Sequence, residues 1–128
     1  MKANLKVVEL KEFEKEIIRQ AGNLVSIRRG SNLFAAGETA NRVFLVEKGW
    51  LKICRVNPEG EHIAVGNLRG PGDLLGAAEA LWGEHHKYGA HGVTDGLISV
   101  LSRKAFLELL DTEPFLAVKL CKTVVFLS

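Results

Sequence analysis

The sequence predicts a mainly β fold with flanking helices. We expect a double-stranded β-helix, a jelly-roll-like β-roll, with an N-terminal helix and C-terminal helices. Between residues 24 and 101, short apolar runs at strand spacing are separated by turn signals about every ten residues. Helical spacing of apolar residues marks the segments before and after this region. The 128 residues fit one domain, which can bury a core without disulfides or metal.

Residues 8–22 are expected to form the N-terminal helix, with Gly22 as its C-cap. Apolar residues recur at helical spacing along one side, namely Leu10, Phe13, Ile17 and Ala21. Charged residues occupy the other side, namely Lys11, Glu14 and Lys15. The helix is therefore expected to pack with its apolar stripe against another element.

Residues 24–101 are expected to form the β-roll. Its apolar pairs at strand spacing are Val25/Ile27, Val43/Leu45, Leu51/Ile53 and Ile63/Val65. The sharpest turn signal is Asn57-Pro58-Glu59-Gly60, because Pro58 sets the first turn dihedral and Gly60 tolerates a positive φ. The segments on either side of this turn should pair as a hairpin. We interpret Gly30, Gly37 and Gly49 as further corner residues.

Residues 102–128 are expected to be helical. Ser102 can cap a short helix, and the stretch Asp111-Thr112-Glu113-Pro114 ends it and starts another with Pro114 in the first turn. The last segment is apolar almost all round apart from Lys119, Lys122 and Thr123, so it requires a partner surface. The residues expected to pair with a second copy of the chain include Phe115, Val118, Leu120, Val124 and Val125.

Composition excludes several classes of protein. The formal net charge of +2 argues against a DNA-binding module, which usually has a clustered basic face. Cys54 and Cys121 are too few for an iron–sulfur cluster or a four-thiolate zinc site, and we expect both to be buried. No secretory signal or membrane-spanning run is evident, so the chain is expected to be cytoplasmic and to have no membrane partner.

A spaced set of motifs resembles the cyclic-nucleotide-binding-domain family, and within it the CRP/FNR-type bacterial transcription regulators. The motifs are Arg29-Gly30, Ala36-Gly37-Glu38, Val43 to Val46 followed by Gly49, Gly60, Gly70 to Gly76, and Thr94-Asp95, and Val100 to Leu110 resembles the closing helix. The resemblance extends from about Ile27 to Leu120. It implies that residues 1–128 are an effector-sensing domain without the DNA-binding helix-turn-helix.

The same resemblance implies where a ligand binds. Gly76 and the helix-prone residues after it offer free backbone N–H groups to an anion. The candidate ligand-binding residues are Gly76, Ala77, Ala78, Glu79, His86, Lys87 and Tyr88. No catalytic residues are predicted, because no Ser/His/Asp or Cys/His arrangement can be argued from spacing. The chain is therefore not expected to be an enzyme.

The candidate site departs from family members that bind cyclic AMP or cyclic GMP. Ala77 stands where they have a Glu that binds the ribose, and His86 stands where they have an Arg that binds the phosphate. A histidine is only partly protonated at neutral pH and cannot bind two oxygens as a guanidinium does. Glu79 is not expected to replace the missing Glu, because two positions along a helix is a rotation of about 200°. Strand alternation also points Lys87 to the other face from His86.

Several alternatives stay open at this stage. The chain could be a genuine cyclic-nucleotide-binding domain, or its histidines His62, His85, His86 and His91 could bind haem. A cupin-like metalloprotein shares the roll, but it requires a His-x-His pair that this sequence lacks.

Our main hypothesis is a sensor domain that binds a small effector other than cyclic AMP or cyclic GMP. It would form a homodimer through its C-terminal helix and reach DNA only through a domain outside this chain. The identity of the effector, the target genes and the question of a truncated or a stand-alone domain stay open.

Overall fold

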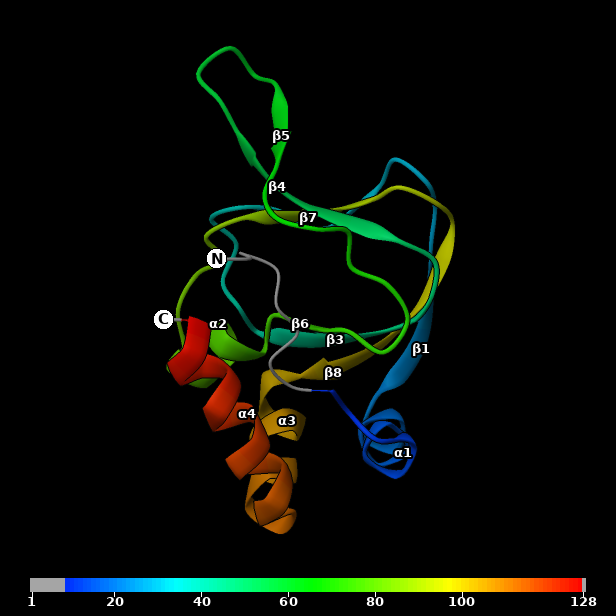
Figure 1. Ribbon diagram of the computed structural model, residues 1–128, viewed down its shortest axis with the longest axis vertical. Helices are drawn as coiled ribbons and strands as arrows, with labels where there is room; N and C mark the ends of the chain where they lie inside the picture. Colours follow the sequence, from blue (N-terminus) through cyan, green and yellow to red (C-terminus); the bar gives the residue numbers. More distant parts are fainter. Residues whose placement is uncertain (1–8, 128) are drawn as a thin grey trace.

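The computed structural model (Figure 1) describes residues 9–127, with side chains described for residues 9–120. Within this range, strands form the body of the molecule and helices pack against one side of it. In chain order the elements are α1 (Glu12–Ala21), β1 (Asn23–Ile27), β2 (Asn32–Phe34), β3 (Arg42–Lys48), β4 (Leu51–Val56), β5 (His62–Ala64), β6 (Leu74–Leu75), α2 (Ala77–Trp82), β7 (Gly89–Gly92), β8 (Gly96–Ser102), α3 (Arg103–Thr112) and α4 (Pro114–Leu127).

The strands form two antiparallel sheets, which confirms the predicted β-roll with flanking helices. One sheet has the order β1-β8-β3-β6 and the other has the order β2-β7-β4-β5. In Figure 1 the second sheet lies above the first, and all four helices lie at or below the first sheet. Every strand pairing is antiparallel, so each sheet mixes strands that are far apart in sequence.

Strand alternation on the first sheet separates two hydrophobic cores. Phe44 and Val46 of β3 face the second sheet, whereas Val43 and Leu45 face the helices. The core between the sheets contains Ile27, Phe34, Phe44, Val46, Leu51, Leu75, Ala90 and Ile98. The core under the helices contains Leu10, Ile18, Val43, Leu45, Ala80, Leu101, Phe106, Leu116 and Leu120.

The hairpin predicted at residues 57–60 is confirmed. β4 and β5 pair with Val56 opposite His62, and Gly60 has a φ of 86°. The side-chain oxygen of Asn57 accepts hydrogen bonds from the backbone N–H groups of Glu59 and Glu61, at 3.1 and 2.8 Å. The turn is therefore stabilised by Asn57 in addition to Pro58 and Gly60.

The predicted start of the C-terminal helices is also confirmed. Ser102 caps α3 by accepting a hydrogen bond from the N–H of Ala105 at 3.0 Å. Helix α3 ends at Thr112, and α4 begins with Pro114, whose missing N–H costs nothing at a first helical position.

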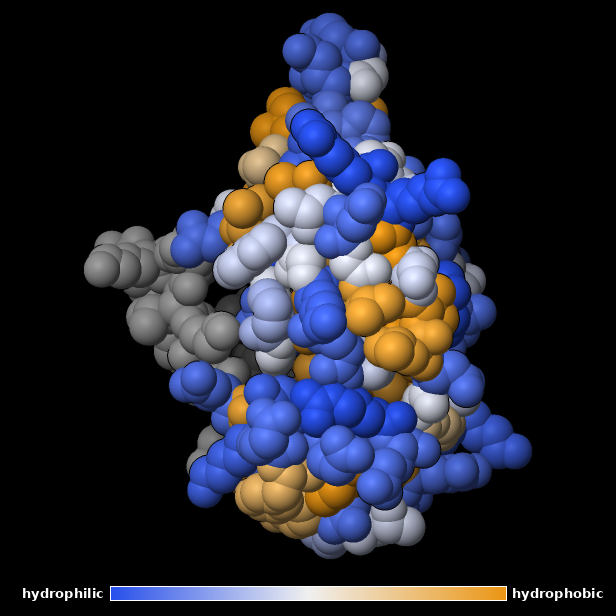
Figure 2. Space-filling model, turned by 90° about the vertical axis from the view of Figure 1, so that its right-hand side faces the viewer, coloured by the Kyte–Doolittle hydropathy of each residue, from blue (hydrophilic) through white to orange (hydrophobic). Residues whose placement is uncertain are grey.

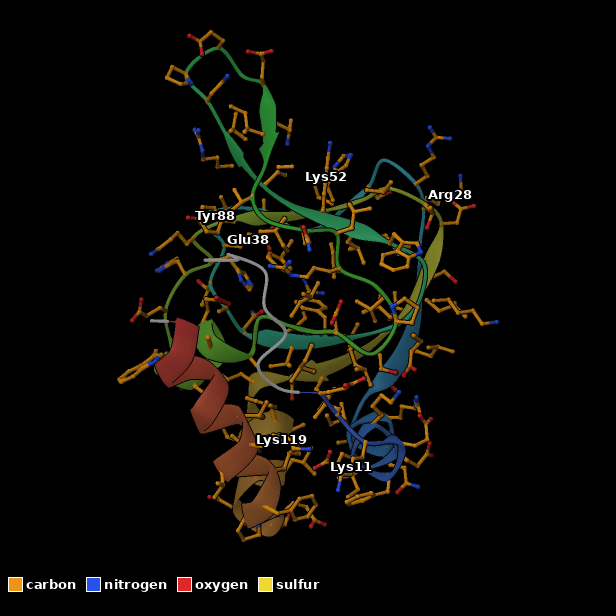
Figure 3. The ribbon with its side chains drawn as sticks, viewed as in Figure 1. Lys11, Arg28, Glu38, Lys52, Tyr88 and Lys119 are labelled. Carbon is orange, nitrogen blue, oxygen red and sulfur yellow. The ribbon has the colours of Figure 1, made fainter. Side chains whose placement is uncertain are left out.

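Helix α1 differs from its prediction in extent and orientation. Residues 9–11 are not helical, and Val8 lies outside the described residues. Leu10 and Ala21 contact the core under the helices as predicted, but Phe13 is 56% exposed and Glu14 is 2% exposed, so the predicted apolar stripe is wrong at these two positions. The reason is a partner that the local pattern does not reveal: Nζ of Lys119 in α4 lies 2.5 Å from Oε1 of Glu14, and the N–H of Lys11 donates to the same oxygen at 2.7 Å. Figure 3 shows Lys119 and Lys11 beside the space between α4 and α1.

Helix α4 packs one side on the chain itself. Leu116 and Leu120 are buried in the core under the helices. Leu120, which was expected to pair with a second copy, therefore packs on the chain itself. Phe115 and Val118 are 42% and 57% exposed. The side chains of Cys121, Val124 and Val125 lie outside the described residues, whereas Cys54 is buried as predicted.

The surface is mainly polar, with local apolar patches. Strand β1 is an edge strand on the side of the molecule that Figure 2 shows, where apolar side chains interrupt a hydrophilic surface. Its exposed apolar residues are Leu24 and Val25. Among the described residues, no helix combines the length and apolar character that crossing a membrane requires.

Candidate functional site

Gly76 brings three segments of the candidate site together. It follows β6, caps α2 and has a φ of 81°, which glycine adopts without steric cost. A Cβ atom at Gly76 would lie 3.2 Å from the backbone oxygen of Arg42 and 3.2 Å from Cε1 of His86. Only a glycine therefore allows β3, the start of α2 and the segment before β7 to approach this closely.

His86 is buried inside the roll. Its side chain is 3% exposed, and its ring stacks on Phe34 with centroids 3.9 Å apart and an interplanar angle of 18°. Phe34 stacks in turn on Phe44, with centroids 5.3 Å apart. The side chain at the position that the family resemblance assigned to a phosphate-binding Arg is thus part of an aromatic stack.

Backbone pairing fixes the direction of His86. Its N–H donates to the backbone oxygen of Glu38 at 2.8 Å, and its carbonyl accepts from the N–H of Gly37 at 2.8 Å. The extended backbone alternates, so His85 and Lys87 are exposed while His86 faces inward. His86 is buried and Lys87 is exposed, so the prediction that strand alternation points them to opposite faces is confirmed.

Two carboxylates and one guanidinium surround the His86 imidazole. Oε2 of Glu79 lies 3.7 Å from Nδ1 of His86, so the expectation that Glu79 points away from the site is wrong. Residues 77 and 79 do point to different sides of α2, as the helical rotation requires. His86, however, lies on the side of α2 to which Glu79 points. Burial lowers the pKa of His86 below its usual 6.5, Glu79 and Glu38 oppose this change, and Arg42 adds to it. Burial therefore favours the neutral form of the imidazole.

The remaining predicted residues are distributed around this centre. Ala77 and Ala78 are half-buried in the first turn of α2, and Ala77 packs against the core under the helices. Tyr88 is half-buried, and Figure 3 shows it with Glu38 at the end of the roll where α2 lies. The structure thus brings together Gly76, Glu79 and His86, and it separates Lys87 from them.

Sequence reasoning missed four residues of the site, namely Phe34, Glu38, Arg42 and Phe44. One signal for Arg42 was present. Residues 42, 44 and 46 alternate along one strand, so an inward Phe44 places Arg42 on the same face. The contact of Phe34 with His86 joins β2 to the segment before β7, which are distant in sequence, and no local pattern indicates it.

The other histidines do not converge on His86. His91 lies opposite Lys52 in register, and Figure 3 shows Lys52 projecting away from the roll. The ring of His91 lies 5.7 Å from the ring of His62, centroid to centroid, and its Nδ1 is 2.9 Å from Oδ1 of Asn32. No group of three or more metal-binding side chains exists among residues whose side chains are described. The cupin-like alternative therefore has no support from this arrangement.

The far end of α2 is joined to α3. Nε of Arg103 donates a 2.6 Å hydrogen bond to the backbone oxygen of Ala80, and the N–H of Arg103 donates to the backbone oxygen of Asn41 at 2.8 Å. A guanidinium at a helix C-terminus satisfies a carbonyl group and complements the helix dipole. The start of α3 is thus fixed to both α2 and the segment before β3.

Comparison with protein families gives one match. Residues 24–113 match the cyclic nucleotide-binding domain, a segment that covers more than half of the chain. The comparison with curated proteins found no significant match.

Solved structures share the fold. The N-terminal domain of a transcriptional regulator from Streptomyces coelicolor has 22% identity and a TM-score of 0.73, covering 91% of this chain and 82% of that one. The catabolite activator protein of Thermus thermophilus has 23% identity and a TM-score of 0.80, covering 91% of this chain and 54% of that one. The sensor domain of the transcriptional regulator DNR from Pseudomonas aeruginosa has 22% identity and a TM-score of 0.73, covering 91% of this chain and 78% of that one. The chain thus spans only about half of the Thermus protein.

Proposed function

This chain belongs to the cyclic nucleotide-binding domain family, and from this premise we propose that it is the effector-sensing domain of a CRP/FNR-type bacterial transcription regulator. The fold that it shares with the sensor domain from Pseudomonas and the regulator domain from Streptomyces supports this role. A regulator of this kind acts in the cytoplasm, contacts DNA through a separate domain and performs no catalysis.

The observation that carries the ligand part of this proposal is the buried position of His86. A neutral imidazole stacked on Phe34 cannot replace a charged, bidentate Arg–phosphate contact, which is worth about 1.5–3 kcal/mol. Ala77 supplies no hydrogen-bond acceptor for a ribose hydroxyl. At the two positions that the resemblance assigns to the nucleotide, phosphate and ribose both lose their usual partner. The proposed effector is therefore a small molecule other than cyclic AMP or cyclic GMP, bound around Gly76, Ala77, Ala78, Glu79, His86 and Tyr88.

The exposed part of α4 supports a homodimer. Phe115 and Val118 are exposed on the same helix that buries Leu116 and Leu120, and Phe13 of α1 lies beside Phe115 with ring centroids 5.8 Å apart. Burying exposed apolar side chains against a second copy is favourable by about 25 cal/mol per Å². Binding of the effector at one end of the roll would be relayed to this helix through α2 and α3.

A thermal-unfolding screen of the purified chain tests the sensing role. A ligand that binds only the folded state raises the melting temperature, because binding at 100 times Kd adds about 2.7 kcal/mol. We expect a shift with a small organic effector and little shift with cyclic AMP, cyclic GMP or haem. A large shift with cyclic AMP would contradict the ligand assignment, and a chain that responds to no compound in a broad metabolite library would contradict sensing itself.

The position of Glu79 favours a second candidate, a genuine cyclic-nucleotide-binding domain. Its carboxylate reaches the His86 side of α2 and could accept a ribose hydroxyl in place of the Glu that position 77 lacks. Under this alternative, cyclic AMP binds wild-type protein, and Glu79→Gln weakens binding while Glu84→Gln, an exposed control just beyond α2, does not.

A further inference from the structure

We infer that Arg42 provides the oxyanion-binding group of the effector site, and that the effector is a small organic acid or phosphate that also carries hydroxyl or amino groups. The inference rests on the proposed sensing function and names the ligand chemistry of the same site. It is derived from the position of Arg42, its free hydrogen-bonding capacity and the charges around it.

Arg42 lies on the inner face of the first sheet. Alternation along β3 places it on the same face as Phe44, and its Cζ atom lies over the Phe44 ring, 5.3 Å from the centroid. Phe44 stacks on Phe34, and Phe34 stacks on His86. Arg42 therefore forms the outer end of the stack whose inner member is His86.

Arg42 is also adjacent to Gly76. The backbone oxygen of Arg42 and Cε1 of His86 both lie 3.2 Å from the point where a Cβ on Gly76 would be. The positive charge of Arg42 contributes to the lowered pKa of His86, so the two side chains interact through space. Cδ1 of Phe44 lies 3.6 Å from the same point, so the guanidinium over the Phe44 ring is near the start of α2.

Within the part of the chain whose side chains are described, the guanidinium of Arg42 has unused donors. Among residues with described side chains, it makes no hydrogen bond or ion pair, whereas Arg19, Arg69 and Arg103 bind oxygen atoms of the protein. Arg42 is exposed, so a ligand can reach it. Its Cζ atom lies over the Phe44 ring, and a guanidinium can bind a carboxylate or phosphate through two parallel hydrogen bonds.

The surrounding charges restrict the ligand further. The carboxylates of Glu38 and Glu79 and the guanidinium of Arg42 all interact electrostatically with His86. When the imidazole is neutral, these groups carry two negative charges and one positive charge. A simple inorganic anion gains from Arg42 but is repelled by both carboxylates. A ligand that also carries hydroxyl or ammonium groups donates hydrogen bonds to those carboxylates, and it is therefore favoured over inorganic phosphate.

Calorimetric titration of the full chain tests this inference with three probes. L-Malate carries two carboxylates and a hydroxyl group, and glycerol 3-phosphate carries a phosphate and two hydroxyl groups. Inorganic phosphate is an oxyanion without an organic hydroxyl or amino group. We expect saturable binding of at least one organic probe, and binding of inorganic phosphate at least about tenfold weaker. Which organic probe binds more tightly distinguishes a carboxylate effector from a phosphate effector.

Substitutions at Arg42 give the decisive comparison. Arg42→Gln should weaken the bound probe about ten- to a hundredfold, as expected for loss of a charged hydrogen-bonding pair, while Arg42→Lys retains part of the affinity. Arg28→Gln is the matched control, because Arg28 is exposed at the opposite end of the roll (Figure 3) and should leave binding unchanged. Thermal unfolding of each variant confirms that it is folded.

Two results would overturn the inference. Binding by Arg42→Gln within twofold of wild type would remove Arg42 from the site but leave the sensing role intact. Binding of neither organic probe would exclude the ligand class, and the metabolite screen described for the proposed function would then show separately whether the domain senses any other compound.

Discussion

Lys119 of α4 holds the buried carboxylate of Glu14 in α1, with Nζ and Oε1 2.5 Å apart. The Glu14 side chain is 3% exposed and that of Lys119 is 24% exposed, so water screens this pair only weakly. The pair joins the first and last helices of the domain across the face of the first sheet.

Removing one member of this pair should destabilise the domain strongly. Lys119→Met leaves an uncompensated buried carboxylate, which costs about 3 kcal/mol, whereas Glu14→Leu combined with Lys119→Met removes both charges and should come within about 1 kcal/mol of wild type. Urea unfolding of both single variants and the double variant measures the coupling. Purely additive effects of the two substitutions would contradict this role.

Acid should destabilise the domain before its carboxylates titrate. Burial lowers the pKa of His86, and burial with the charge of Lys52 lowers that of His91, so both histidines bind protons more readily in the unfolded chain. The free energy of unfolding is therefore greatest above the ordinary histidine pKa of 6.5 and falls as the pH drops below it. Urea unfolding at pH 7.5 and 5.5 measures this loss.

His86→Phe provides the control for that pH effect. Phenylalanine keeps a ring stacked on Phe34 but does not titrate, so the loss of stability between pH 7.5 and 5.5 should be smaller than in wild type. An unchanged loss would assign the effect to other groups. The pKa of Glu14 is also lowered, because hydrogen bonds from Lys119 and Lys11 outweigh its burial, but it titrates below pH 4.5, outside this window.

Gly49→Ala should be far more destabilising than Gly60→Ala. Both glycines have a positive φ, but a Cβ at Gly49 would lie 2.5 Å from the backbone oxygen of Asp95, whereas a Cβ at Gly60 meets nothing within 4 Å. We expect a loss of about 1 kcal/mol at Gly60 from backbone strain alone and about 2–5 kcal/mol at Gly49 from strain and steric overlap. Equal losses in thermal or urea unfolding would show that the approach of β3 to β8 relaxes at no cost.

Charged substitutions on α4 should abolish the proposed homodimer. Phe115→Asp and Val118→Asp place charges on the exposed side of the helix, and sedimentation should change from a dimeric to a monomeric mass at micromolar concentration. Leu24→Asp is the control, because Leu24 is 62% exposed on β1 and should leave the mass unchanged. A monomeric wild type, or a dimer disrupted only by Leu24→Asp, would place the interface elsewhere or exclude it.

Features that depend on neighbouring residues could be predicted from the sequence. The hairpin at residues 57–60 requires only Pro58, Gly60 and flanking strand spacing, and the starts of α3 and α4 require only Ser102 and Pro114. Local propensity and tertiary structure agree at these positions, so the predictions hold.

Features that depend on distant partners could not be predicted. Glu14 is buried because of Lys119, which is 105 positions away in sequence, so the helical pattern alone placed it on the wrong side of α1. The same reason explains Glu79, whose neighbour His86 belongs to another segment, and the burial of His86 beneath Phe34. The resemblance suggested candidate residues, but sequence spacing could not show which of their side chains face one another.

The hydrogen bond from Arg103 to the end of α2 limits how the domain can move. Helix α2 cannot slide along the first sheet unless the 2.6 Å bond to Ala80 breaks or the start of α3 is carried with it. Since Thr112 and Pro114 are separated by one residue, a displaced α3 would tilt α4 about that joint. A displacement of α2 beside Gly76 would thus reach α4 through Arg103 and the one-residue connection between α3 and α4.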